Sequence, residues 1–452
     1  MKRGAALALG LAVLFLLYGF GLDRVGMLGP DEPRYAAIGR AMAESGDWVT
    51  PRLWSTPWFE KPALLYWMTA VGYKLGLNPD LAPRVPVALA SVAFLAFFWS
   101  FLRREFGEPE ALYATAILAT CAGWLTYGHV AVTDLPLAVC FSAAALLLLP
   151  GEGRTKPVAS GIFLGLAVLA KGLVPLVLIL PAFWFLRKRA KEIAIVMGVA
   201  VLVAAPWYAL VTPRSGRPFL EEFFWKHHFA RFATGSLQHV RPVWFFVPVL
   251  LAATFPWTPL LALLFDKQLY ADGRVRFLAA YLGFGLLFFS FSENKLPGYL
   301  LPLLPGLTAL LGIAVARGRR ACWALAGAAA LLCLIPVVAE ALPAALLNGA
   351  SRVKPAVSPW QIAGGLATGI VVWALCSRRS RIGAAGLVAT GVTAGVIYLV
   401  WVTFPVLETT VSARQFWRSH QDIQCVDAGN RGWQYGVAYY AGRAVPLCEP
   451  AP

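Results

Sequence analysis

The sequence predicts an all-α protein that crosses a membrane many times. Of its 452 residues, 59% are hydrophobic and only 14% are charged, whereas soluble domains contain about 25% charged residues. Long apolar runs alternate with short basic clusters, and the mean hydropathy is +0.66. A net charge of +16 in this arrangement is typical of membrane topology signals, so we expect no nucleic-acid partner.

The apolar runs predict about thirteen transmembrane helices. A spanning helix needs about 20 mostly apolar residues to cross the hydrocarbon core. Two of the predicted spans are short and flank Lys171. The expected spans are Ala5–Leu22, Ala82–Leu102, Ala111–Gly128, Val130–Leu149, Val158–Ala170, Leu173–Leu186, Ile193–Val211, Val243–Phe265, Phe277–Phe291, Tyr299–Val315, Cys322–Ala339, Ile362–Cys376 and Ile382–Pro405.

Basic clusters occur in every second loop, which predicts a cytoplasmic N-terminus and an outer C-terminus. The first apolar run follows Lys2-Arg3 and lacks a cleavage site, so it is interpreted as a signal anchor. The aromatic-flanked segment Pro62–Leu77 is placed along the outer surface. We therefore expect a membrane domain at 1–406, with interfacial helices in a first outer loop at 23–81, and a small outer segment at 407–452.

The outer C-terminal segment is too small for a large core and is interpreted as an α/β appendage. Short stretches at Ile423–Asp427 and Val437–Tyr440 are typical of β-strands. Cys425 and Cys448 also lie there, where an oxidising compartment would allow a disulfide worth about 3 kcal/mol. The other five cysteines fall within predicted spans, where we expect them to be inert and apolar: Cys121, Cys140, Cys322, Cys333 and Cys376.

Charged side chains kept close to the membrane gather at the outer ends of the predicted spans. Since a charge at the centre of a span costs about 2.5–3.5 kcal/mol, such groups indicate a functional site. A cluster of mixed sign favours a site that handles a charged head group. Its members are Asp31, Glu32, Arg34, Glu60, Lys61, Asp134, Lys171, His227, His228, Arg231, Glu293 and Lys295.

Structural roles explain some of these residues equally well. Asp31 and Glu32 precede a helix predicted over Arg34–Glu44 and could cap its positive end. Asp134 could cap the apolar helix that it begins. Adjacent histidines, such as His227 and His228, are more often interfacial than metal-binding.

Several blocks of this sequence together resemble the bacterial aminoarabinose transferase family, which modifies lipid A and is related to protein O-mannosyltransferases. The blocks are Asp31-Glu-Pro-Arg34-Tyr35-Ala, Gly46-Asp47-Trp48, Phe59-Glu60-Lys61-Pro62, Tyr66-Trp67, Thr133-Asp134-Leu-Pro136 and Asn294-Lys295-Leu-Pro297-Gly-Tyr299. The resemblance covers residues 1 to about 405 in hydropathy. It implies the membrane glycosyltransferase fold of the GT-C class and a bacterial inner-membrane location with the active site on the periplasmic face.

The resemblance also implies a reaction and site residues. A sugar, either 4-amino-4-deoxy-L-arabinose or another pentose or hexose, would pass from undecaprenyl phosphate to lipid A or another envelope acceptor. Asp31 and Asp134 match catalytic carboxylates. Lys61, Arg231 and Arg34 match donor-phosphate contacts, while Glu60, His227 and His228 match a metal-site region. Glu32, Tyr35, Lys295 and Tyr299 are expected to contact substrate.

The residue chemistry agrees with this assignment. Expelling a phosphate from a sugar requires cations near its oxygens, and Lys61 and Arg231 are suitable. A divalent ion (zinc, magnesium or manganese) could assist there. Asp31 could accept a proton from the acceptor or orient it. The sequence contains no glycine-rich nucleotide loop, so we expect no nucleotide cofactor.

Two other functions are compatible with the composition. A secondary transporter would place charges at the membrane midplane between internal repeats, and the charges here lie at one rim. A polymerase or ligase of surface polysaccharide would also use polyprenyl-linked sugars, although the blocks of the first loop favour the transferase.

Overall fold

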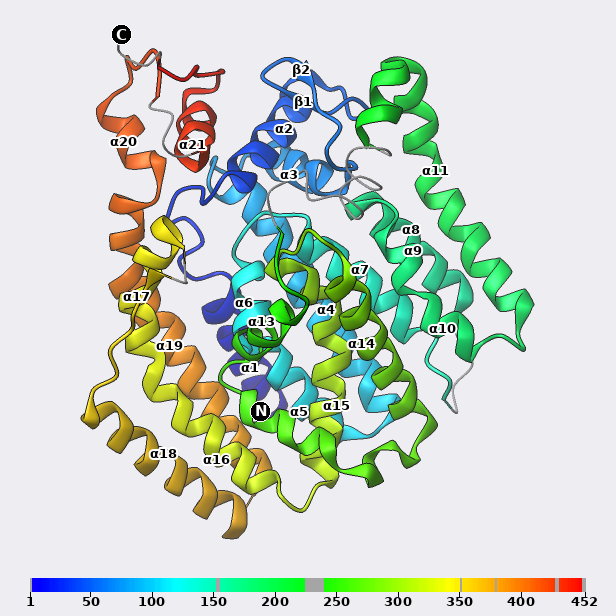
Figure 1. Ribbon diagram of the computed structural model, residues 1–452, viewed down its shortest axis with the longest axis vertical. Coiled ribbons are helices and arrows are strands. Elements are labelled where there is room, and N and C mark those ends of the chain that lie inside the picture. Colours follow the sequence, from blue (N-terminus) through cyan, green and yellow to red (C-terminus); the bar gives the residue numbers. More distant parts are fainter. Residues whose placement is uncertain are drawn as a thin grey trace.

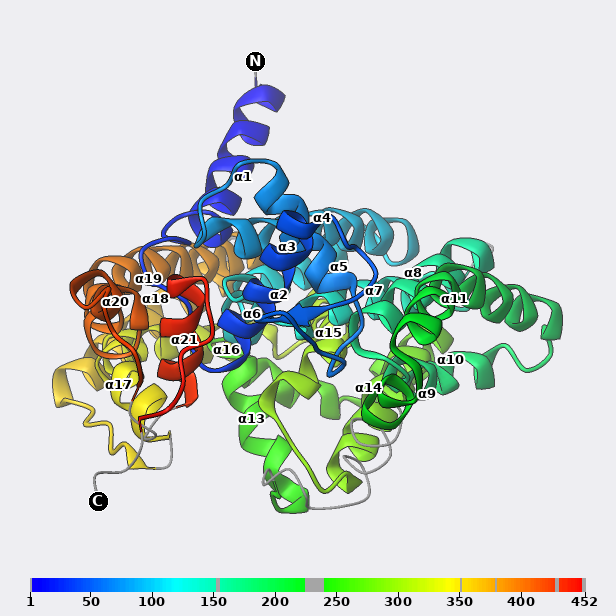
Figure 2. The same cartoon turned by 90° about the horizontal axis from the view of Figure 1, so that it is seen from above.

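A computed structural model describes residues 2–151, 155–223, 240–349, 352–378, 380–426 and 431–448. In this part of the chain the fold is helical, and the only paired strands are the two-residue β1 and β2, which form an antiparallel hairpin. The predicted all-α membrane fold is therefore confirmed. Figures 1 and 2 show α8–α11 on one side and α16–α19 on the opposite side of a central group that includes α4, α5, α7 and α15.

The first half of the chain contains α1 (Lys2–Tyr18), α2 (Asp31–Ser45), β1 (Arg52–Leu53), β2 (Thr56–Pro57), α3 (Leu64–Lys74), α4 (Leu81–Glu105), α5 (Glu108–Thr120), α6 (Ala122–Gly128), α7 (Asp134–Leu146), α8 (Pro157–Lys171), α9 (Val174–Leu178), α10 (Leu180–Phe185) and α11 (Ala190–Leu220). The second half contains η2 (Val243–Phe245), α13 (Phe246–Ala253), η3 (Thr258–Phe265), η4 (Lys267–Ala271), α14 (Gly273–Phe291), η5 (Pro297–Leu303), α15 (Leu304–Arg317), α16 (Ala321–Leu331), η6 (Leu332–Leu334), α17 (Ile335–Asn348), α18 (Pro359–Arg378), α19 (Arg381–Thr410), α20 (Ala413–Ser419) and α21 (Arg431–Ala441).

Judged by the length and composition of the helices alone, the structure has fewer candidate membrane spans than predicted. Seven helices in the described ranges are long and apolar enough to cross a membrane, or eight if the pair that bends by 115° between Ala253 and Thr258 is one span. Other predicted spans are short or interrupted. Proline explains part of this, because Pro175 and Pro181 each lie near the start of one of the two short helices that replace the span expected after Lys171. The count of thirteen is therefore not established.

Two segments far apart in the sequence cover one end of the molecule. The first loop (residues 23–81) supplies α2, the β1–β2 hairpin and α3, and the C-terminal segment (residues 407–448) supplies α20 and α21. Figure 1 shows these elements together, with α21 beside α2. Helix α2 ends at Gly46, whose positive φ of 73° suits glycine and whose amide donates to the carbonyl of Met42.

Basic residues of several loops contact the ends of neighbouring helices. Arg274 of α14 donates to the carbonyl of Glu105 at the end of α4, and Arg317 of α15 lies 3.2 Å from Glu110 of α5. Arg381 of α19 donates to backbone carbonyls at the end of α15. Loops that the charge pattern assigned to one side of the membrane are thus neighbours in the fold.

The C-terminal segment differs from the predicted α/β appendage. Residues 437–440, expected as a strand, lie inside helix α21, and the extended pairing there is an isolated bridge between Val426 and Leu447. Cys425 and Cys448 form a disulfide beside this bridge. The helix is stabilised by packing against α2 and α20, which local strand propensity does not include.

One expectation about the cysteines was wrong. Cys322 of α16 and Cys376 of α18 form a disulfide rather than serving as separate apolar residues. The two helices pack side by side, which brings the thiols together across 54 residues of sequence. Cys121 and Cys140 are buried free thiols, as the hydrophobic pattern predicts, and Cys333 is half-buried.

Candidate functional site

Arg34 of α2 is the centre of an ion network in the first loop. Its guanidinium pairs with Asp31, one turn earlier on the same helix, and lies 3.3 Å from a carboxylate oxygen of Glu60. The other carboxylate oxygen of Glu60 is 3.0 Å from the ammonium group of Lys61. Four of the predicted site residues therefore form one connected group, with Asp31 as its most exposed member.

Aromatic rings enclose the Arg34 side chain, which is only 8% exposed. Its guanidinium carbon lies 5.0 Å from the ring centre of Tyr435, 5.5 Å from that of Trp58 and 5.9 Å from that of Tyr35. Burial alone would lower the pKa of Arg34, but the carboxylates of Glu60 and Asp31 raise it above its ordinary value. Arg34 therefore stays charged in a largely desolvated position.

Two polar groups close to this network have no hydrogen-bond partner among the described residues. They are the indole N–H of Trp58 and the hydroxyl of Tyr66, which is fully buried in α3. Burial, followed by the charge of Glu60, raises the pKa of Tyr66, so its hydroxyl remains a donor. Unpaired buried donors beside an ion network are costly and are typical of a binding site.

A second ion pair involves the other predicted catalytic carboxylate. Asp134 begins α7, and its Oδ1 is 2.6 Å from the ammonium group of Lys171 at the end of α8. That ammonium group lies 4.9 Å from the ring centre of Tyr299 in η5. The residue preceding Asp134, Thr133, occupies the cap position, and Asp134 is the acidic residue of the first turn, where its charge favours the helix end. Its ion pair with Lys171 goes beyond that structural role.

The chain of η5 passes directly over this second pair. A Cβ atom added to Gly298 would lie 2.3 Å from Oδ1 of Asp134 and 2.7 Å from the hydroxyl of Tyr127. Only glycine fits so close an approach. Tyr127 is within electrostatic range of both Asp134 and Asp31, one from each ion network.

Glu32 belongs to a third, fully buried arrangement. Its carboxylate accepts two hydrogen bonds of 2.8 Å from Arg84 of α4 and further hydrogen bonds from the amides of Leu28 and Ala131. Arg84 in turn donates to the carbonyls of Leu22, Val25 and Gly26. These contacts occupy Glu32 within the fold, and they indicate a structural role instead of the substrate contact expected from the sequence.

Lys295 is also buried and is engaged by the backbone. Its ammonium group donates to the carbonyls of Arg241 and Ser292. In the described contacts it supports the turn between α14 and η5, and the ion pair with Asp134 is supplied by Lys171 instead.

The remaining predicted site residues, Arg231, His227 and His228, lie outside the described residues. Within the described ranges, no group of three or more His, Cys, Asp or Glu side chains could hold a metal ion. Glu60 is the described member of the predicted metal region, and its two oxygens contact Arg34 and Lys61. A metal site that includes His227 and His228 therefore stays a prediction.

Sequence reasoning did not single out Arg84, Tyr127, Gly298 or Tyr435 as parts of these networks. Arg84 carried a signal, because an arginine in the first turn of an apolar helix needs a buried partner. Tyr435 carried none, since its contact with Arg34 joins residues about 400 positions apart.

Comparisons with known proteins agree with the fold and the blocks of the first loop. Residues 60–210 match the family model described as dolichyl-phosphate-mannose-protein mannosyltransferase. The chain is 35% identical over 340 residues to an undecaprenyl phosphate-alpha-4-amino-4-deoxy-L-arabinose arabinosyl transferase of Pseudomonas fluorescens, and the match covers 71% of this chain and 61% of the relative. A relative with the same description from Erwinia tasmaniensis is 32% identical over 66% of this chain and 57% of its own length. The chain thus spans about three fifths of the length of these relatives.

A solved structure extends the likeness to almost the whole fold. The crystal structure of ArnT from Cupriavidus metallidurans bound to undecaprenyl phosphate superposes with a TM-score of 0.80 at 25% identity, covering 99% of this chain and 86% of that chain. The family-model match includes Glu60, Lys61, Asp134 and Lys171, and the structural match covers almost the whole chain. By sequence and by fold, the chain belongs to the aminoarabinose transferase family, within the GT-C class of membrane glycosyltransferases.

Proposed function

We propose that this protein transfers 4-amino-4-deoxy-L-arabinose, or a closely related sugar, from undecaprenyl phosphate to a lipid A-type acceptor. The observation that carries the proposal is the network of Asp31, Arg34, Glu60 and Lys61, next to the pair of Asp134 and Lys171. The relatives carry the same donor in their descriptions. The charge pattern of the loops supports a cytoplasmic N-terminus and a reaction at the outer face, and the likeness to the aminoarabinose transferases supports the bacterial inner membrane as the location.

The chemistry requires a cation at the leaving group. An acceptor oxygen forms a bond to the anomeric carbon, the bond from that carbon to the phosphate oxygen breaks, and the electron pair leaves with undecaprenyl phosphate. Lys61 stabilises the charge that develops on the phosphate, and Glu60 holds its ammonium group in place. Arg34 remains charged beside Glu60 and adds to the positive potential that stabilises the phosphate.

Asp31 is suited to the acceptor side of the reaction. It is the most exposed carboxylate of the network, with 45% of its side chain accessible, and Arg34 fixes its position. It either accepts the proton of an acceptor hydroxyl or orients an acceptor phosphate, which needs no strong base. Lys171 holds Asp134, the second carboxylate of the proposed site, in place. Tyr127 is within electrostatic range of both Asp134 and Asp31.

The test uses purified protein in lipid nanodiscs with undecaprenyl phosphate and a panel of undecaprenyl-phosphate sugars. Lys61→Ala is the test variant, and Lys74→Ala, which changes an exposed lysine at the end of α3, is the control. We expect the wild type and Lys74→Ala to release undecaprenyl phosphate when lipid A is added. Lys61→Ala should lose at least about a hundredfold in turnover, the usual cost of removing one transition-state charge contact.

Two results would contradict the proposal. Failure of the wild type to bind any polyprenyl-phosphate sugar would favour transport, which a flux assay in proteoliposomes measures. Equal turnover in Lys61→Ala and Lys74→Ala would remove Lys61 from the donor site.

A further inference from the structure

Tyr435 of α21 brings the C-terminal segment into contact with the candidate site. Its ring centre lies 5.0 Å from the guanidinium carbon of Arg34 and 6.0 Å from that of Arg431. The ring is half-buried, whereas Arg431 is exposed. Tyr435 is thus placed between a buried arginine of the site and an exposed arginine on its own helix.

The contact matters because Arg34 organises the rest of the network. Its guanidinium holds Asp31 and Glu60, and Glu60 in turn holds Lys61. An aromatic ring over a desolvated guanidinium restricts its tilt and stabilises its charge. Loss of the ring would therefore displace both the carboxylate on the acceptor side and the cation on the donor side.

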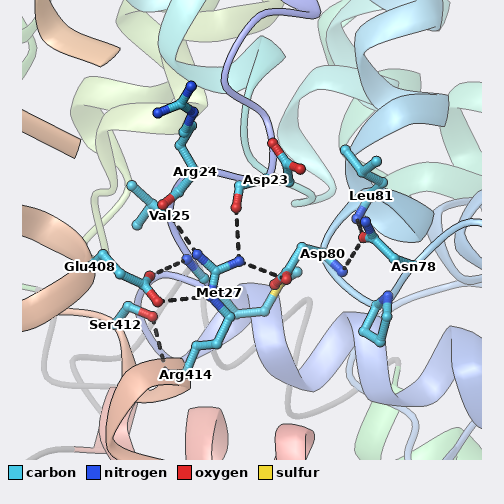
Figure 3. A network of polar contacts seen from close by, with 12 residues as sticks. Asp23, Arg24, Val25, Met27, Asn78, Asp80, Leu81, Glu408, Ser412 and Arg414 are labelled. Carbon is cyan, nitrogen blue, oxygen red and sulfur yellow. Dashed lines mark hydrogen bonds and ion pairs between the residues drawn. The ribbon is translucent and has the colours of Figure 1, made fainter. Parts of the chain in front are cut away.

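The C-terminal segment that carries Tyr435 is also anchored to the first loop through α20. Figure 3 shows Arg414 bonded to Asp80, to Glu408 and to the carbonyls of Asp23 and Arg24. The distance from Arg414 Nη1 to Asp80 Oδ2 is 2.7 Å, and the pair is almost fully buried. This cluster joins residues 23–27 and 78–81 to the end of α19 and the start of α20.

Helix α21 has its own attachments to the same loop. The hydroxyl of Tyr440 donates to Asp80 at 2.7 Å and accepts from the amide of Met27. The hydroxyl of Tyr439 donates to the carbonyl of Pro79 at 2.6 Å. The Cys425–Cys448 disulfide closes the chain around the helix. These contacts fix the position of Tyr435 relative to α2.

We propose that Tyr435 is a positioning residue of the transferase site, through which the C-terminal segment holds Arg34 in its phosphate-binding orientation. The inference deepens the proposed function, on which it rests. It assigns the segment a part in the site, where the sequence predicted only an appendage.

The experiment measures undecaprenyl phosphate binding and steady-state transfer by the full chain in nanodiscs. Tyr435→Leu removes the ring and should weaken binding by roughly threefold to thirtyfold, the range of a desolvated cation–π contact. Tyr435→Phe keeps the ring and should restore binding to within about twofold of wild type. In an Arg34→Met background, Tyr435→Leu should have no further effect on binding, since the ring acts through Arg34.

Trp433→Leu is the matched control. Trp433 lies on the same helix but contacts Phe416 of α20, with ring centres 4.9 Å apart. Wild-type binding in Tyr435→Leu would overturn the inference, and so would equal weakening in Tyr435→Leu, Tyr435→Phe and Trp433→Leu, which would indicate general loosening of the segment. A wild type that binds undecaprenyl phosphate but transfers no sugar would refute the proposed function alone, because the binding series still decides the role of Tyr435.

Discussion

Asp31 and Glu32 are consecutive residues of α2, yet they have opposite environments. The Glu32 side chain is fully buried, and Arg84 together with backbone amides satisfies its carboxylate. The Asp31 side chain is 45% exposed and belongs to a network that includes Arg34. Two carboxylates of one motif therefore have different roles: Glu32 holds α2 against α4, and Asp31 is the partly exposed carboxylate that we propose contacts the acceptor.

The comparison shows that charge type and position in a motif do not separate a structural from a functional residue. A buried pair with every acceptor satisfied leaves no capacity for a ligand, whereas a partly exposed network with unpaired donors nearby retains it. Three carboxylates of the first loop have different environments: the Glu32 side chain is fully buried, whereas those of Asp47 and Asp31 are 29% and 45% exposed. Changes to each should have different consequences.

The largest effect is expected on stability, when the buried pair of Glu32 and Arg84 is broken. Arg84→Met leaves a buried carboxylate without its counter-charge and should lower the free energy of unfolding by about 3–5 kcal/mol. Glu32→Gln combined with Arg84→Met should recover part of the loss, since the amide needs no counter-charge. Thermal unfolding in detergent measures both.

Arg40→Met provides the control, because Arg40 forms an exposed pair with Glu44 on the same helix. That change should cost no more than about 1 kcal/mol. Similar stability of the Arg84 and Arg40 variants would contradict the structural role assigned to the buried pair.

The second effect concerns Asp31. Asp31→Asn retains the shape of the side chain but removes its charge, and we expect turnover to fall by about a hundredfold, the lower range for a positioned acid or base. Unfolding should change by less than about 1 kcal/mol, because the pair is exposed on one side. The variant is compared with wild type in the nanodisc transfer assay; turnover within a factor of about two of wild type would remove Asp31 from the site.

The sequence predicted the membrane class well, because hydropathy depends on composition over long windows. It also grouped Asp31, Arg34, Glu60 and Lys61 correctly as a charged cluster, since they lie within one loop. The partner of Glu32 was missed because Arg84 lies 52 residues away, within a predicted membrane span.

The C-terminal segment was harder to predict. Val437, Tyr439 and Tyr440, between Gly432 and Gly442, favour a strand locally, but contacts with α2 and α20 stabilise helix α21. Its contact with the site depends on the tertiary fold, in which Arg414 and Tyr440 converge on Asp80. No local pattern contains that information.

The smallest effect is expected at Asp47, whose pairing with Arg214 is partly exposed to solvent. Partial burial raises the pKa of Asp47, but hydrogen bonds from the amides of Thr50 and Val49 outweigh this and lower the pKa below its ordinary value. A lowered folded-state pKa means that Asp47 stabilises the loop above the ordinary carboxyl range, and that this contribution is lost as the pH falls through the lowered value.

Acidification should therefore loosen the turn between Asp47 and Thr50, together with the contact of 3.3 Å from Arg214 of α11 to Asp47. Hydrogen exchange of residues 47–53 in nanodiscs measures this, with exchange rates corrected for pH. Wild type should lose protection as the pH is lowered below about 4, whereas Asp47→Asn, which has no charge to lose, should have weaker protection that does not change over the same range. A parallel loss in both proteins would show that another carboxylate controls the turn. Glu32 should then be the next residue tested, because its burial makes it the costliest carboxylate in the loop to leave charged without Arg84.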